Sequence, residues 1–134
     1  MKRATREWVR KAEADYRLAE TIAEGSEPFH DQLCFHCQQS AEKYLKALLE
    51  ELGQSVPKLH DLNQLSRRLQ PFHPTVSSMR RGLLMLTDFA VDTRYPGNWA
   101  TKRQALSALR WADRVRDTCR TLLGLRPPRR PKSK

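Results

Sequence analysis

The sequence predicts an all-α protein, an up-and-down antiparallel bundle of about five helices. Apolar residues recur at steps of three and four in several long segments, which is the spacing of a helical face. Gly and Pro residues separate five such segments. No stretch alternates apolar and polar residues as a half-buried strand does. Short connections between successive helices favour antiparallel neighbours.

The first two segments carry the clearest helical patterns. One apolar stripe precedes Gly25, and a longer one runs from Leu33 to Leu52. On the opposite face of the second segment, Glu42 lies four residues before Lys46, the favourable order for a side-chain pair. We therefore interpret this face as solvated. The stripes consist of Val9, Ala12, Tyr16, Ala19 and Ala23, and of Leu33, Cys37, Ala41, Tyr44 or Leu45, Leu48 and Leu52.

Three further helices are predicted from their boundaries. The third begins at Asp61, whose carboxylate can cap it while Gln64 reaches back, and it ends before Pro71. The fourth ends where the sequence reaches Arg94. The fifth begins with a capping box of Thr101 and Gln104 and continues to Gly124. The fourth is expected to bury Met79, Leu83, Leu86 and Ala90.

Length and charge bound the domain organisation. The 134 residues suit one domain, residues 1–125, followed by a basic Pro-rich tail, residues 126–134. The 25 Lys and Arg residues exceed the 15 Asp and Glu residues, which gives a net charge of +10. Five of the cations lie in the tail, which is interpreted either as a solubility tail or as an arm that follows phosphates.

The cysteines and the hydropathy pattern indicate a cytoplasmic protein. No apolar signal region follows Met1, and no segment is long and apolar enough to cross a bilayer. Cys34 and Cys37 have the spacing of two zinc ligands, but there is no second such pair to complete four ligands. We predict no metal and no cofactor.

Three blocks, in order, resemble one family. They are residues 35–49 (FHCQQSAEKYLKALL), His60-Asp61-Leu62 and Arg94-Tyr95-Pro96. Together they resemble the HEPN domain over roughly residues 6–123. The resemblance implies a compact helical bundle that usually dimerises. It also implies a cytoplasmic prokaryotic protein that pairs with a small nucleotidyltransferase, often as toxin and antitoxin.

The resemblance leaves the enzymatic role open. Many HEPN proteins are metal-independent ribonucleases that use an Arg and a His separated by four to six residues. After Arg94 those positions hold Trp99, Ala100 and Thr101, none of which is a general base. His73 follows Arg67 and Arg68 at that spacing, but Pro71 intervenes and such pairs arise by chance in an arginine-rich chain. We predict binding rather than catalysis, with His73 as a weak catalytic candidate.

The candidate binding residues centre on Arg94. Arginine can hold a phosphate bidentately, and an aromatic ring can stack on a base, so we predict that this region binds a nucleotide or unpaired RNA. In the structural alternative, Arg94 pairs with Asp92 or Glu42, Tyr95 fills the bundle, and Pro96 simply ends the helix. The candidates are Asp92, Arg94, Tyr95, Asn98 and Trp99, with Glu42, Lys43, Lys46 and His60 as weaker ones.

Three functions follow from these observations. The first is a nucleotide- or RNA-binding homodimer that acts as the toxin-like or regulatory partner of a small nucleotidyltransferase. The second is a metal-independent ribonuclease toxin. The third is a purely structural dimerisation module.

Overall fold

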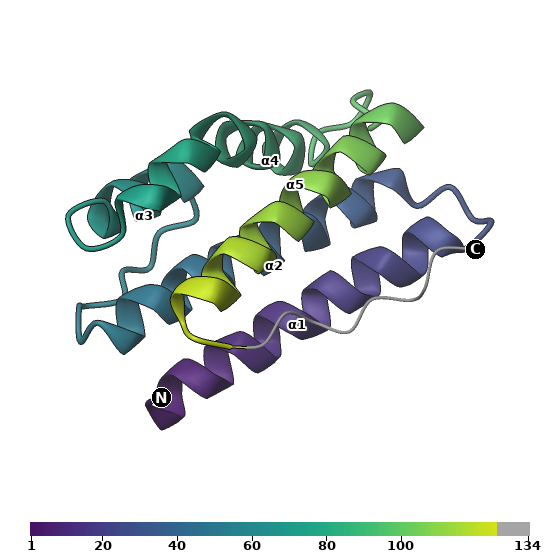
Figure 1. Cartoon of the computed structure of the whole chain (residues 1–134). Helices are drawn as coiled ribbons and strands as arrows, with labels where there is room; N and C mark the ends of the chain where they lie inside the picture. Colours follow the sequence, from purple (N-terminus) through teal and green to yellow (C-terminus); the bar gives the residue numbers. More distant parts are fainter. Residues whose placement is uncertain (126–134) are drawn as a thin grey trace.

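The computed structural model describes residues 1–125 and confirms the all-α prediction (Figure 1). This part of the chain contains five α helices and one 3₁₀ helix, and no strand. The helices are α1 (Arg3–Glu24), α2 (His30–Glu51), α3 (Leu62–Leu69), η1 (Pro74–Met79), α4 (Arg80–Asp92) and α5 (Lys102–Leu122). The predicted basic tail lies outside the described residues.

Helix α2 occupies the centre of the bundle. It packs against each of the other four α helices, most extensively against α1. Helices α3 and α4 lie on the side of α2 away from α1, and α5 crosses beside α2 (Figure 1). Because neighbours cover α2 on several sides, even part of its polar face lies inside the protein.

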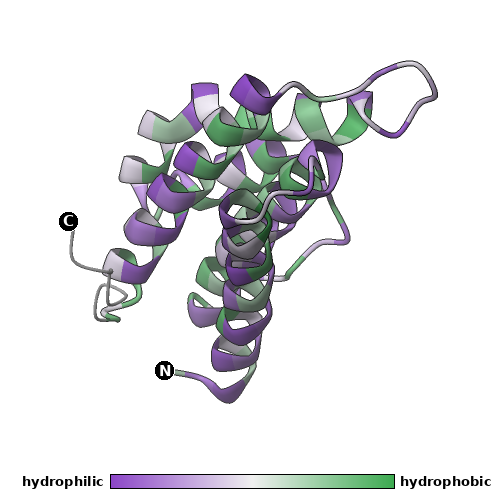
Figure 2. Ribbon diagram, turned by 90° about the vertical axis from the view of Figure 1, so that its right-hand side faces the viewer, coloured by the Kyte–Doolittle hydropathy of each residue, from purple (hydrophilic) through white to green (hydrophobic). Residues whose placement is uncertain are grey.

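The core forms from the predicted stripes. Hydrophobic residues gather where the helices face one another, and hydrophilic residues dominate their outer sides (Figure 2). Ala12, Tyr16 and Leu45 are buried, as are the four predicted residues of the fourth helix. Removing this apolar surface from water is the main force that holds the helices together. No helix of residues 1–125 is long and apolar enough to span a membrane.

The caps confirm the predicted starts of α3 and α5, but the Gln64 side chain does not reach back to Asp61 as predicted. The Asp61 carboxylate accepts hydrogen bonds from the backbone N–H groups of Asn63, at 2.9 Å, and Gln64, at 3.4 Å. At α5, the Thr101 hydroxyl accepts from the Gln104 N–H at 3.1 Å, and the Gln104 side chain accepts from the Thr101 N–H at 2.9 Å. Both caps satisfy N–H groups that have no partner within their helix.

A polar cluster joins α1, α2 and α5 within the bundle. Both carboxylate oxygens of Glu13 accept hydrogen bonds from Arg116, at 2.6 Å and 2.7 Å, and one also accepts from the Tyr44 hydroxyl. The Arg116 guanidinium lies 4.2 Å from the centre of the Tyr16 ring. Burial opposes the charge of Glu13, but the hydrogen bonds from Arg116 and Tyr44 outweigh it and lower its pKa.

The close approach of α4 and α5 depends on a glycine. A Cβ atom at Gly82 would lie 2.0 Å from the Trp111 ring, so any larger residue would collide with the indole. The missing side chain lets Trp111 cover the backbone of α4 at this point. The contact therefore fixes how closely the two helices pack.

Candidate functional site

The segment between α4 and α5 forms a sharp turn that its sequence explains. The Asn98 N–H donates to the Tyr95 carbonyl at 3.2 Å, which closes a four-residue turn. Pro96 takes the second position, where its fixed φ fits, and Gly97 takes the third with a φ of 89°. This is the pattern of a type II turn, and it directs the chain back toward α5.

Both ends of this segment are fixed to the bundle. At its start, the Thr93 hydroxyl donates to the Phe89 carbonyl at 2.8 Å. At its end, the Ala100 N–H donates to the carboxylate of Asp31 on α2 at 2.7 Å, and Thr101 then caps α5. The loop of residues 93–100 is thus held at both ends, which limits the conformational entropy that it would lose on binding a ligand.

The loop exposes its aromatic rings and its arginine. Tyr95 is 62% exposed and Trp99 is 78% exposed, although large aromatic side chains usually gain free energy by burial. Arg94 is exposed, and its side chain has no ion pair or hydrogen bond within residues 1–125. Two parts of the structural alternative do not hold. Tyr95 does not fill the bundle, and Arg94 pairs with neither Asp92 nor Glu42.

A pocket of about 450 Å³ lies against the loop and the end of α4. It brings together three of the predicted site residues, Asp92, Asn98 and Trp99, while Arg94 and Tyr95 lie on the loop but do not line it. The pocket is mainly polar, with aromatic side chains from Phe89 and Trp99. Its lining residues are Phe89, Asp92, Thr93, Gly97, Asn98, Trp99 and Gln104.

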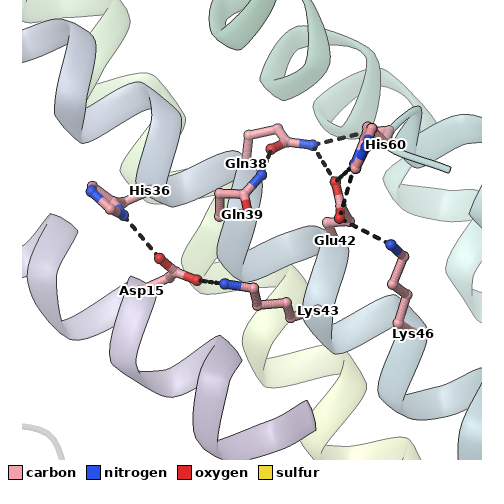
Figure 3. A network of polar contacts seen from close by, with 8 residues as sticks. All are labelled: Asp15, His36, Gln38, Gln39, Glu42, Lys43, Lys46 and His60. Carbon is pink, nitrogen blue, oxygen red and sulfur yellow. Dashed lines mark hydrogen bonds and ion pairs between the residues drawn. The ribbon is translucent and has the colours of Figure 1, made fainter. Parts of the chain in front are cut away.

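A second polar cluster surrounds Glu42 in the middle of α2 (Figure 3). Its carboxylate accepts hydrogen bonds from Gln38 Nε2 at 3.1 Å and Lys46 Nζ at 3.1 Å, and it lies 3.2 Å from Nδ1 of His60. Glu42 and Lys46 are both buried, so the interpretation of this face as solvated was wrong. Two segments cover this face of α2. His60, before α3, contacts Gln38 and Glu42, and on the α1 side Nζ of Lys46 lies 5.7 Å from the centre of the Trp8 ring.

His60 connects this buried carboxylate to the surface. Its side chain is 75% exposed, and its Nδ1 atom faces Glu42 while its backbone carbonyl accepts from Gln38 (Figure 3). A carboxylate at one ring nitrogen fixes the ring orientation and leaves Nε2 toward solvent. The weaker candidates Glu42, Lys46 and His60 therefore form one unit.

Lys43 belongs to a different group, between α1 and α2. It pairs with Asp15, whose other carboxylate oxygen lies 2.9 Å from Nδ1 of His36 (Figure 3). Sequence reasoning missed both Asp15 and His36. The available signal was that His36 and Lys43 are seven residues apart and thus share one face of α2.

Comparison with known proteins identifies the family. The sequence model of the HEPN domain matches residues 5–122, most of the chain. This protein belongs to the HEPN domain family. Its fold is similar to the crystal structure of an archaeal HEPN homologue, with a TM-score of 0.71 and 24% sequence identity over 92% of this chain and 99% of the other. No curated protein matches the sequence.

Arg67, Arg68 and His73, the residues with the predicted ribonuclease spacing, do not lie on one helix. Arg67 and Arg68 belong to α3, which ends at Leu69. His73 follows beyond Pro71 and precedes η1, so it does not share a helix face with either arginine. The position of His73 therefore does not support a catalytic role for it.

The cysteines of the HEPN domain are packed as apolar side chains. Cys34, Cys37 and Cys119 are buried free thiols. Burial, with a smaller effect from Asp31, raises the pKa of Cys34 to about 11, and burial raises that of Cys37 as well. A zinc ligand must be a thiolate, which this environment disfavours. Residues 1–125 contain no group of three or more His, Cys, Asp or Glu residues that could hold a metal ion.

Proposed function

We propose that this HEPN domain binds a nucleotide unit, free or within unpaired RNA, through the loop of residues 93–100. The observation that carries the proposal is the unpaired Arg94 beside two exposed aromatic rings on a loop fixed at both ends. Stacking of a base on an aromatic ring contributes about 1–3 kcal/mol, and a guanidinium can hold a phosphate with two parallel hydrogen bonds. The pocket beside Trp99 adds amide and carboxylate groups that can meet the edge of a base.

The test is titration of a short unpaired oligoribonucleotide and of ATP into Arg94→Ala. Loss of a charge-assisted contact worth about 1.5–3 kcal/mol should weaken binding by about tenfold or more. The melting temperature should not change, because an exposed cation contributes little to stability. Arg94→Lys should restore binding only in part, since an ammonium does not form the paired hydrogen bonds.

Two controls distinguish binding at this site from non-specific electrostatic attraction. Arg10→Ala removes an exposed arginine from α1, on the other side of α2, and should bind as the wild type does. Truncation after Leu125 removes five cations and should flatten the salt dependence without removing selectivity among nucleotides. Unchanged affinity in Arg94→Ala together with a lower melting temperature would contradict the proposal and favour a structural module.

We propose that the biological role is that of a toxin-like or regulatory partner of a small nucleotidyltransferase. The support is family membership together with the resemblance of the three sequence blocks. A test begins with the neighbouring gene: if it encodes such an enzyme, the two proteins should co-purify after joint expression. Separate elution of the pair would contradict this role.

The ribonuclease alternative has a direct test. The expected result is that purified protein does not cleave RNA without metal, because no general base follows Arg94 at the family spacing. Metal-independent cleavage that disappears in His73→Ala would show that His73 is catalytic. Cleavage that disappears in His60→Ala but survives in His73→Ala would instead assign proton transfer to the imidazole beside Glu42.

A further inference from the structure

The segment from α3 to the middle of α4 is strongly basic. Residues 62–87 contain Arg67, Arg68, Arg80 and Arg81 and neither Asp nor Glu. Asp61 directly precedes this segment, but its carboxylate accepts from two backbone N–H groups of α3. The positive potential of this surface is therefore not balanced by an acid from its own segment.

Two of these arginines border a polar pocket of about 260 Å³ between α3 and η1. The pocket has no acidic and no apolar lining residue. Neither Arg67 nor Arg80 has an ion pair or a side-chain hydrogen bond within residues 1–125. The pocket is lined by Asn63, Ser66, Arg67, Gln70, Ser77 and Arg80.

Ser66 gives the pocket a polar group at its inner wall. The residue is only 6% exposed, and its hydroxyl makes no hydrogen bond to the described residues. Several helical Thr hydroxyls, such as those of Thr21 and Thr87, instead donate to a carbonyl of the preceding turn. Because Ser66 lines the pocket and its hydroxyl has no partner among the described residues, the hydroxyl is available to donate to an acceptor bound there.

We propose that this pocket binds a phosphate group. Arg67 and Arg80 would hold its oxygens, and the hydroxyl of Ser66 would donate a further hydrogen bond. The site differs from the loop of residues 93–100, since α4 separates the two, and it does not require that the loop bind a base. The phosphate could be the end of an RNA strand, a phosphodiester within it, or a free phosphate.

The first experiment titrates inorganic phosphate while side-chain NMR signals of the arginines are followed. We expect saturable shifts for Arg67 and Arg80, and at least about tenfold weaker binding in Arg67→Ala and in Arg80→Ala. Arg68→Ala and Arg81→Ala are matched controls, because each removes an exposed neighbouring arginine that does not line the pocket. Ser66→Ala should also weaken phosphate binding, whereas the two control variants should bind phosphate as the wild type does.

The second experiment separates the sources of the phosphate. An oligoribonucleotide with a 5′-phosphate is compared with the same strand bearing a 5′-hydroxyl. If the protein prefers the 5′-phosphorylated strand and Arg80→Ala removes that preference, the ligand is a terminal phosphate. If both strands bind equally and Arg80→Ala weakens both, the ligand is an internal phosphodiester. If Arg80→Ala affects only inorganic phosphate, the ligand is a free phosphate.

Two results would overturn the proposal. One is the absence of a saturable response of Arg67 and Arg80 to inorganic phosphate. The other is an equal loss of binding in all four arginine variants, which would show general charge attraction. Arg94→Ala should leave the response of Arg67 and Arg80 to inorganic phosphate unchanged. Failure of this pocket and failure of the loop site can therefore be told apart.

Discussion

Glu13 shows how a single residue can make stability depend on pH. Its pKa in the folded protein lies below the usual 4.5 because hydrogen bonds from Arg116 and Tyr44 overcome the effect of burial. Its stabilising contribution is therefore complete above the unfolded pKa of about 4.5. That contribution is lost as the pH falls through the folded pKa.

Glu13→Gln should therefore destabilise the protein at neutral pH but not in strong acid. We expect a loss of about 1–3 kcal/mol at pH 7, since hydrogen bonds to a charged group are replaced by neutral ones. Thermal melts of both proteins across the acid range measure the difference, which should shrink as the pH falls below about 4.5. A difference that is constant with pH would exclude the charge of Glu13 as its cause.

Glu42 and Lys46 mark the limit of prediction from sequence at the scale of residues. The pair was recognised from its spacing, and the salt bridge at 3.1 Å confirms it. Its burial was not recognised, because a polar helical face has the same sequence pattern whether water or another segment covers it. His60 and Asp15 contact α2 from 18 and 28 residues away in the chain, measured to Glu42 and Lys43, and no local pattern encodes those contacts.

At the scale of helices, the contact of Gly82 with Trp111 gives the sharpest expectation. Gly82→Ala places a methyl group where the indole lies, so α4 and α5 must separate or Trp111 must leave its position. We expect a loss of about 1–3 kcal/mol, or a drop of several degrees in melting temperature, measured by circular dichroism.

Gly25→Ala is the matched control for this substitution. A Cβ at Gly25 meets only ordinary contacts of 3.5 Å and 3.6 Å, and its φ of −81° suits any residue. It should melt close to the wild-type temperature. Equal melting temperatures for Gly82→Ala and the wild type would show that the bundle adjusts to the methyl group without cost.

The helices themselves were largely predictable, and one connection was not. Caps and periodic stripes placed the starts of α3 and α5, because both signals are local. The 3₁₀ helix η1 was missed because a single short element has no apolar period to reveal it. For the loop after α4, the sequence suggested the residues of the site, but only the structure shows Tyr95 and Trp99 exposed.

For the whole molecule, we expect a homodimer that forms through α4. Leu84 and Val91 are both exposed and lie seven residues apart, on one side of this helix. HEPN domains often dimerise, and an exposed apolar stripe favours association. Light scattering at low micromolar concentration should report twice the 15.6 kDa mass of the chain.

Substitutions on the stripe test the interface. Val91→Glu should convert the dimer to a monomer without unfolding it, because the residue is exposed in the single chain. Leu18→Glu places the same charge at an exposed leucine of α1 and should leave the dimer intact. A wild-type protein of monomeric mass, or dissociation by Leu18→Glu alone, would contradict an interface on α4.

The central position of α2 has a consequence for the order of folding. Helices α1 and α2 are adjacent in the chain and pack extensively, so they can meet after closure of a very short loop. Helix α5 returns to α2 from a distant part of the sequence, and its docking carries a larger closure entropy. We expect the α1–α2 hairpin to be formed in the transition state. Truncation of Ala12 to Gly should then slow folding, whereas Ala112→Gly should mainly accelerate unfolding.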